Sequence, residues 1–184
     1  MLLRRDDLVR RRIQGAVLTR QLEAGRIKRV GRGLYRLAGS EPGAHAGLAQ
    51  ASRLAPRGTV CLLSALAWHG LTTQLPAAVW LQFGHKDRVP TSLTGPVEIV
   101  RATGPARTMG VTHVTIDGVS VPMTTPAKTV ADCFKHRVRI GLDIAIEALR
   151  EGLTTRAFTP DGFLEAAEAC RVARLARPYL EALA

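Results

Sequence analysis

RIKRVGRGLYRL, residues 26–37, is a short basic segment that turns about two glycines. Apolar side chains lie on both sides of the turn, which predicts a β-hairpin, and glycine supplies the backbone freedom that a tight turn needs. Five of the twelve residues are basic: Arg26, Lys28, Arg29, Arg32 and Arg36. The segments around this hairpin indicate what so many basic side chains could bind.

Two short helices are expected before the hairpin. Residues 4–12 carry Asp6 and Asp7 in the first turn and arginines in the last, the order that a helix dipole favours. Residues 15–25 follow, with two leucines four positions apart and a glycine as C-cap. Helix, turn, helix and ribbon is the order of a winged helix-turn-helix, which we predict over residues 1–38.

The way in which a winged helix-turn-helix binds DNA predicts which of these side chains would contact it. Its second helix enters the major groove, and its wing lies beside the phosphates. We therefore expect Thr19 and Arg20, on the second helix, to contact base edges or adjacent phosphates. The expected phosphate contacts on the ribbon are Arg26, Lys28, Arg29, Arg32 and Arg36. Two alternatives remain: the hairpin caps a larger domain with its arginines in solvent, or the domain binds protein.

Charge is concentrated at this end of the chain. The net charge of the 184 residues is +11, and residues 1–36 hold eleven basic and three acidic side chains, a net of +8. Such concentration favours an anionic partner, most often nucleic acid, although a solvated basic terminus has the same composition. No apolar stretch is long enough to span a bilayer, and charges occupy the positions where a signal peptide needs its apolar segment. We expect a cytoplasmic protein that binds no membrane.

The remaining chain predicts a larger domain. Residues 39–47 are rich in Gly, Ala, Ser and Pro and are expected to be a linker before a domain over 48–184. Helices are expected at residues 47–56 and 59–71, and strands at residues 77–83 and 96–103. A hairpin is expected around Asp117-Gly118. Further helices are expected from Pro126 onward, the last of them over residues 160–177. Helices packed on one antiparallel or mixed sheet give an α/β (α+β) fold with a helical C-terminal third.

The sequence contains no recognisable catalytic or metal-binding arrangement. The five histidines lack the spacing of a zinc protease, and the three cysteines lie far apart. Lys128 and Asp132 are four residues apart and are interpreted as a structural pair. We expect no enzymatic activity, no cofactor and no metal. A second set of arginines recurs every third residue on the last helix, as either an anion-binding stripe or an exposed basic face: Arg171, Arg174 and Arg177.

Three segments resemble one known family. RVGRGLYRL (29–37), CLLSALAWHGLTTQLP (61–76) and TPAKTVADCFKHRVRIGLDIAIEALREGL (125–153) look like the AbiEi transcriptional-regulator antitoxins, and the resemblance extends over nearly the whole chain. It implies an N-terminal winged helix-turn-helix and a larger α/β domain. It also implies binding to inverted repeats in the double-stranded DNA upstream of the protein's own operon, and repression of that operon. The implied functional partner is an AbiEii-like nucleotidyltransferase toxin, in a type IV toxin–antitoxin system that in some cases confers abortive infection.

The chain departs from the family at its start. Family members usually have a helix before the one predicted here at residues 6–12, and too few residues precede it in this sequence. Three explanations are open: the true start lies upstream, the C-terminal domain covers the exposed face, or DNA binding is impaired. The alternative function is a protein-interaction antitoxin that neutralises its toxin by direct contact and binds little DNA.

Overall fold

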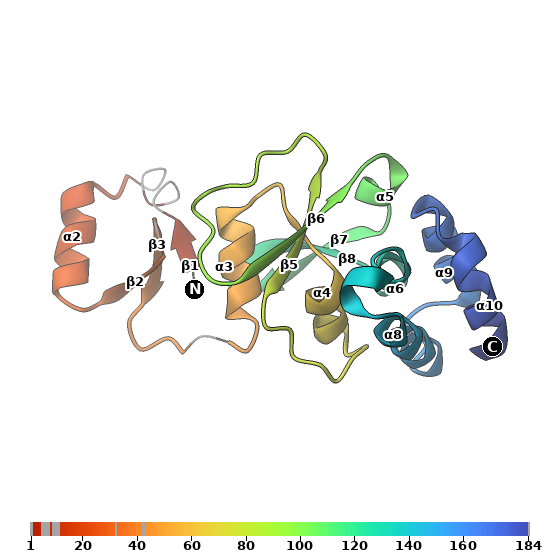
Figure 1. Ribbon diagram of the computed structural model, residues 1–184. Helices are drawn as coiled ribbons and strands as arrows, with labels where there is room; N and C mark the ends of the chain where they lie inside the picture. Colours follow the sequence, from red (N-terminus) through yellow and green to blue (C-terminus); the bar gives the residue numbers. More distant parts are fainter. Residues whose placement is uncertain (1, 5–7, 9–11, 32, 42, 184) are drawn as a thin grey trace.

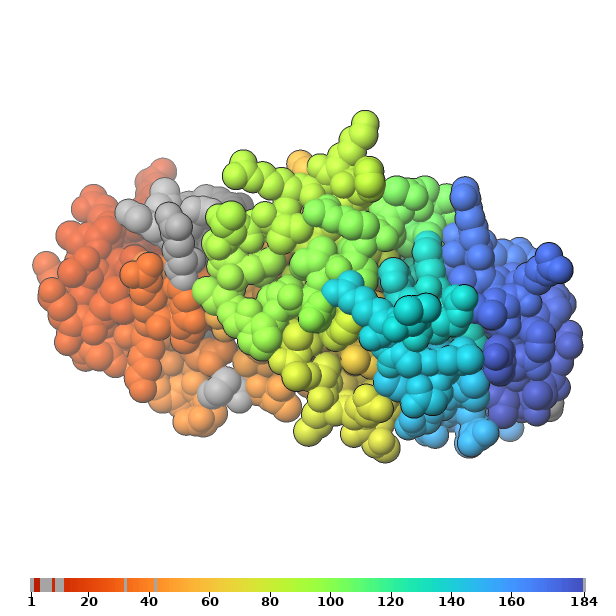
Figure 2. Space-filling model, viewed as in Figure 1, coloured from red at the N-terminus to blue at the C-terminus, as the bar shows by residue number. Residues whose placement is uncertain are grey.

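The computed structural model describes residues 2–4, 8, 12–31, 33–41 and 43–183, and it has a mixed α/β fold with two sheets (Figure 1). The predicted fold class is therefore confirmed. The molecule is elongated, with a small N-terminal sheet at one end, a larger sheet in the middle and a group of helices at the other end (Figures 1 and 2).

The predicted hairpin at residues 26–37 forms part of the small sheet. Strand β2 (Ile27–Gly31) pairs antiparallel with β3 (Leu34–Leu37), after helix α2 (Gly15–Glu23). A third strand that the sequence did not predict, β1 (Leu2–Arg4), pairs with the other side of β3. The helix predicted over 4–12 lies mostly outside the described residues. Helix and ribbon follow each other in the order expected for the second half of a winged helix-turn-helix.

Strand alternation gives the small sheet two different faces. Leu2 and Leu34 are fully buried on the face toward the rest of the molecule, where they join one apolar cluster with helix α3 (Ala46–Leu54). Tyr35, the next residue of β3, is buried and points to the opposite face. Helix α3 thus lies between the two sheets (Figure 1).

The larger sheet has five strands in the order β6-β5-β4-β8-β7. Strand β5 is parallel to β6, β4 is parallel to β8, and the other neighbours are antiparallel. The predicted hairpin is confirmed, with Asp117 and Gly118 both at positive φ in its turn. The strands are β4 (Thr59–Val60), β5 (Val79–Gly84), β6 (Val97–Ala102), β7 (Val111–Ile116) and β8 (Val119–Thr124).

Helices cover both faces of this sheet. On one face, α3 packs against side chains such as Leu81 and Phe83 of β5. On the other, Trp80 joins the core formed with α4 and the C-terminal helices. These helices are α4 (Leu62–His69), α6 (Pro126–Lys135), α7 (Arg137–Ile140), α8 (Leu142–Thr154), α9 (Pro160–Ala169) and α10 (Ala173–Leu183); the short α5 (Pro105–Thr108) follows β6.

Two predicted helices are wrong in extent. The helix expected over 59–71 begins only at Leu62, because Thr59 and Val60 pair with β5 and β8. The helix expected over 160–177 is divided by Arg171, whose φ is 60°. The turn is a Schellman motif, in which Val172 N–H donates to the Ala167 carbonyl at 2.8 Å. Burial of Val172 beside Ala167 stabilises this turn.

Candidate nucleic-acid interface

Helix α2 lies at the free end of the molecule and has no buried residue (Figure 1). Thr19 and Arg20, predicted to contact DNA, are both exposed on it. The Thr19 hydroxyl donates a hydrogen bond to the Gly15 carbonyl at 3.1 Å, so its oxygen is left to accept. Arg20 lies in the last turn, where a positive charge complements the helix dipole. The outer surface of α2 is therefore available for a partner.

The ribbon places three of its predicted phosphate contacts in solvent. Arg26, Lys28 and Arg29 are exposed, and the Arg29 Nε donates to the Gly31 carbonyl at 3.3 Å. Lys28 and Arg29 are neighbours in β2 and therefore point to opposite faces of the ribbon. Arg32 lies outside the described residues. Lys28 is paired with Arg36 and so lies on the face toward the larger domain, whereas Arg29 is paired with Tyr35 and lies on the other face. We use the name N-terminal basic surface for these three exposed cations of the ribbon together with Arg20 of α2.

Arg36 does not belong to that surface. Its side chain is only 12% exposed, and its Nη2 lies 3.7 Å from Asp117 Oδ2 in the β7–β8 turn. Residues paired across antiparallel strands share a face, so Arg36 lies on the same side of the sheet as its partner Leu2, toward the larger domain. The prediction that Arg36 contacts phosphate is corrected: the structure gives this arginine an ion pair within the protein.

The structure does not place the three arginines of the predicted C-terminal stripe on one helix. Arg171 lies in the turn between α9 and α10 and not on the last helix, while Arg174 and Arg177 are three residues apart on α10. All three are exposed. Helix α10 is at the opposite end of the molecule from the ribbon (Figures 1 and 2). These arginines therefore do not extend the N-terminal basic surface.

Sequence reasoning missed a cluster of arginines around Asp87. The Asp87 carboxylate accepts hydrogen bonds from Arg107 Nη2 at 2.6 Å, from Arg57 Nη1 at 3.3 Å and from the Gly84 N–H at 2.8 Å. Arg101 Nη1 donates to the carbonyls of Gly84 and Asp87 at 2.7 and 2.6 Å. One carboxylate and two carbonyls thus hold three guanidinium groups in place.

This Asp87 cluster carries a clear excess of positive charge. Lys86 and Arg88 flank Asp87 and are exposed, so the group contains five basic side chains and one acidic one. It lies where β5 ends, in the middle part of the molecule. The only sequence signal was the run HKDR at 85–88, because Arg57, Arg101 and Arg107 are brought to it by the folding of distant segments. Fixed guanidinium groups with spare N–H donors can bind phosphate.

Lys128 and Asp132, predicted to be a structural pair, are buried in the helical core. The Lys128 ammonium group donates a hydrogen bond to the Asp132 carboxylate, and both side chains are almost completely excluded from solvent. Cys170 Sγ lies 3.3 Å from the other Asp132 oxygen, and burial raises the pKa of Cys170 to about 12. Burial also raises the pKa of Cys61 and Cys133, so all three thiols are protonated at neutral pH.

No metal or membrane feature is found in the part of the chain that the structure describes. Among those residues, no group of three or more His, Cys, Asp or Glu side chains is arranged to hold a metal ion. None of the helices formed by them is both long enough and apolar enough to cross a bilayer.

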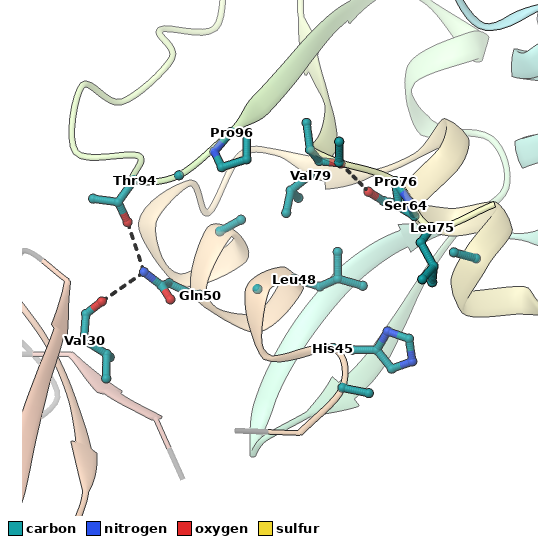
Figure 3. A pocket seen from close by; sticks show the side chains of 17 residues that line it. Val30, His45, Leu48, Gln50, Ser64, Leu75, Pro76, Val79, Thr94 and Pro96 are labelled. Atoms are coloured by element: carbon teal, nitrogen blue, oxygen red, sulfur yellow. Dashed lines mark hydrogen bonds between the residues drawn. The ribbon is translucent and has the colours of Figure 1, made fainter. Parts of the chain in front are cut away.

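A cavity of about 660 Å³ lies beside the ribbon, between α3 and two loops of the larger domain (Figure 3). Gln50 of α3 stands at one end of it, and its Nε2 donates to the Val30 carbonyl at 3.1 Å and to Thr94 Oγ1 at 3.0 Å. Ser64 at the other end is occupied within the protein, since its Oγ accepts from the Trp80 N–H at 3.0 Å. Val30 of β2 lines the same end of the cavity as Gln50, so the ribbon forms part of the wall.

The chain was compared with known proteins. No family model matches it, and no curated protein sequence matches it. Among solved structures it is similar to the RV2827C protein from Mycobacterium tuberculosis, with a TM-score of 0.59 over 98% of this chain and 76% of that chain. The two share a fold. Their sequence identity is 12%, so the similarity to the mycobacterial protein bears on the fold alone.

Proposed function

We propose that this chain is a DNA-binding antitoxin of the cytoplasm. It represses its own toxin–antitoxin operon through upstream inverted repeats and counteracts a nucleotidyltransferase toxin, with no catalytic activity of its own. The resemblance of three sequence segments to the AbiEi antitoxins supports the toxin partner, and the N-terminal basic surface supports DNA as ligand.

The observation that carries the proposal is helix α2 together with the ribbon. A nine-residue helix without a buried residue stands at the end of the molecule, and an antiparallel ribbon with exposed basic side chains follows it. In a winged helix-turn-helix, the exposed side of such a helix reads the major groove, and the ribbon contacts the backbone. Arg20 then reaches base edges or phosphates, and Lys28 and Arg29 neutralise phosphates.

The Asp87 cluster extends this function to the larger domain. Its arginines are held at fixed positions by Asp87 and by main-chain carbonyls, so little side-chain freedom is lost when they bind phosphate. Arg57 is well exposed, with 72% of its side chain accessible to solvent, compared with 43% for Arg107. Inverted repeats require two copies of the protein on one DNA duplex, one at each half-site.

The test is fluorescence anisotropy with the DNA upstream of the protein's own gene and with a scrambled duplex, at several salt concentrations. We expect tighter binding to the upstream DNA, weakened by salt in proportion to the phosphates contacted. Arg20→Ala should reduce the preference for the upstream DNA. Arg150→Ala is the matched control, since this exposed arginine of α8 carries the same charge in the helical part of the molecule.

Equal and weak binding to both duplexes would contradict the proposal. The alternative is an antitoxin that binds its toxin directly and uses little DNA contact. Co-purification of the chain with the product of the neighbouring gene would then support that alternative.

A further inference from the structure

The cavity beside the ribbon has the size of a small-molecule site. Its volume of about 660 Å³ lies within the range of pockets that enclose one ligand of drug-like size. Its walls come from α3 and the residues just before it, from α4, from the loop before β5 and from the loop before β6, with Val30 of the ribbon at one end (Figure 3). Several separate parts of the chain thus surround one space.

The chemistry of the lining selects a neutral, largely apolar occupant. None of the described residues that line the cavity is Asp, Glu, Lys or Arg, although the chain as a whole is 22% charged. A charged ligand would lose its hydration here without gaining a counter-charge. Most of the wall is aliphatic: Leu48, Ala51, Ala67, Leu75, Pro76 and Val79.

The exposure of Leu75 also indicates that an apolar ligand binds in the cavity. It lines the cavity, yet it is 94% exposed, and Pro76 and Ala77 lie next to it on the same wall. A single exposed leucine is ordinary, but an exposed leucine that continues an apolar concave wall marks a binding surface. An apolar ligand in the cavity would remove this side chain from water.

Gln50 supplies the polar end of the cavity. Its Nε2 is occupied by the Val30 carbonyl and Thr94 Oγ1, whereas its Oε1 accepts no hydrogen bond from any described residue. A ligand with one N–H or O–H group can therefore donate to Gln50 Oε1 without breaking an existing hydrogen bond.

The same glutamine connects the cavity to the ribbon. The pairing of β2 with β3 shifts register between Arg29 and Gly31, so Val30 lies at a bulge, and its carbonyl bonds to Gln50. Gly31 allows the close approach, because a Cβ there would lie 3.3 Å from Gln50 Nε2. Any ligand that fixes Gln50 also fixes the bulged part of β2.

We propose that this cavity binds one neutral, largely apolar small molecule with a hydrogen-bond donor, and that Gln50 transmits its binding to strand β2. The ligand then acts as an effector of the ribbon. The consequence for DNA binding rests on the proposed function, whereas ligand binding itself does not.

The probe for the test is N-phenyl-1-naphthylamine, a neutral aromatic amine with one N–H donor whose fluorescence rises in apolar sites. The full chain is titrated with it in the absence of DNA. Trp68 supplies an internal reporter, because its ring lies 4.8 Å, centroid to centroid, from the ring of His45, which lines the cavity. We expect saturable binding of one probe per chain, with energy transfer from tryptophan.

Two exposed residues give a matched pair of variants. Leu75→Ser removes an apolar wall and should weaken probe binding at least about fivefold. Val138→Ser is the control, because Val138 is 93% exposed on α7, away from the cavity, and should leave binding unchanged. Neither change removes a buried side chain, so both variants are expected to fold. Gly47→Leu, which fills the cavity from α3, should abolish binding.

Equal probe binding by the Leu75 and Val138 variants would contradict the proposed site. Binding that does not saturate at one probe per chain would contradict it too.

The connection of the cavity to the ribbon is tested by hydrogen exchange of the β2 amides. The probe should slow their exchange in the native chain and not in Gln50→Ala, while unchanged exchange in the native chain would overturn transmission. Since no DNA is present, failure of the proposed function leaves these results intact.

Discussion

Arg36 and Asp117 join the two sheets of this protein, with 3.7 Å between Arg36 Nη2 and Asp117 Oδ2. Arg36 lies on β3 of the ribbon, and Asp117 lies in the turn between β7 and β8. The Asp117 carbonyl also accepts the Leu2 N–H at 3.4 Å, from the strand on the other side of β3. The ribbon that carries the exposed basic residues is therefore held against the larger domain by one of its own arginines.

Asp117→Asn should lower the free energy of unfolding by about 1 kcal/mol, because it removes the charge facing Arg36 in a largely buried ion pair. Asparagine tolerates the φ of 50° at this position, so the turn is retained. Urea unfolding measures the change. Glu151→Gln, at an exposed position of α8, is the control and should leave stability unchanged. Equal stability of the two variants would show that the ion pair contributes nothing.

Lys28→Ala and Arg29→Ala should each weaken DNA binding and reduce the slope of log affinity against log salt by about 0.9, since each removes one phosphate contact. Arg36→Ala should lower stability and leave that slope unchanged, because Arg36 faces Asp117. Anisotropy titrations over a range of salt concentrations give the slopes. A reduced slope for Arg36→Ala would place this residue on the DNA.

Arg57→Ala tests the Asp87 cluster. Arg57 is exposed and donates one of several hydrogen bonds to Asp87, so its loss should cost little stability. It should nevertheless reduce the salt slope of DNA binding by about 0.9. Arg150→Ala provides the comparison at equal net charge. If both variants bind DNA with the native slope, the cluster contributes no phosphate contact.

Lys128→Met should lower the free energy of unfolding by about 3–5 kcal/mol, because it leaves the Asp132 carboxylate buried without its counter-charge. Replacing both residues, as Lys128→Met with Asp132→Leu, should recover a large part of that loss, since no charge then remains in the core. Urea unfolding of the two variants and the native chain makes the comparison. A double variant no more stable than Lys128→Met would show that packing, and not charge, sets the cost.

His69 should make stability depend on pH. Burial lowers the pKa of His69 from its ordinary value of 6.5, although the hydrogen bond between its Nε2 and the Thr124 carbonyl, at 2.7 Å, opposes the shift. The unfolded chain therefore binds the proton more readily, so the stability contribution is complete above pH 6.5 and is lost as the pH falls through the folded pKa. Burial lowers the pKa of His136 too, with the same sign.

The measurement is urea unfolding at about pH 7.5 and about pH 5.5, on either side of the ordinary histidine pKa. His69→Gln keeps a side-chain N–H donor for Thr124 but cannot be protonated, so its stability should fall less between the two pH values. An equal fall in the native chain and the variant would assign the effect to His136 or to other groups.

Local chemistry made much of the secondary structure predictable. Asp117-Gly118 formed the predicted hairpin turn because these residues adopt positive φ at low cost, and Pro126 began a helix as expected. The failures came where tertiary contacts override local preference. Thr59 joined a strand because β5 and β8 lie beside it, and Arg171 ended α9 because Val172 is buried.

The same division applies to the candidate interface. The density of basic residues at 26–36 is a property of the sequence alone, and so is the ribbon that carries them, because turn geometry and charge are local. The tertiary structure determines which of those basic side chains are exposed to solvent. Strand pairing places Arg36 beside Asp117 and leaves Arg29 exposed. Folding also assembled the Asp87 cluster from residues up to fifty positions apart, between Arg57 and Arg107. The positions of the charged residues are set by the sequence. The exposure of their side chains depends on which distant segments the tertiary structure brings beside them.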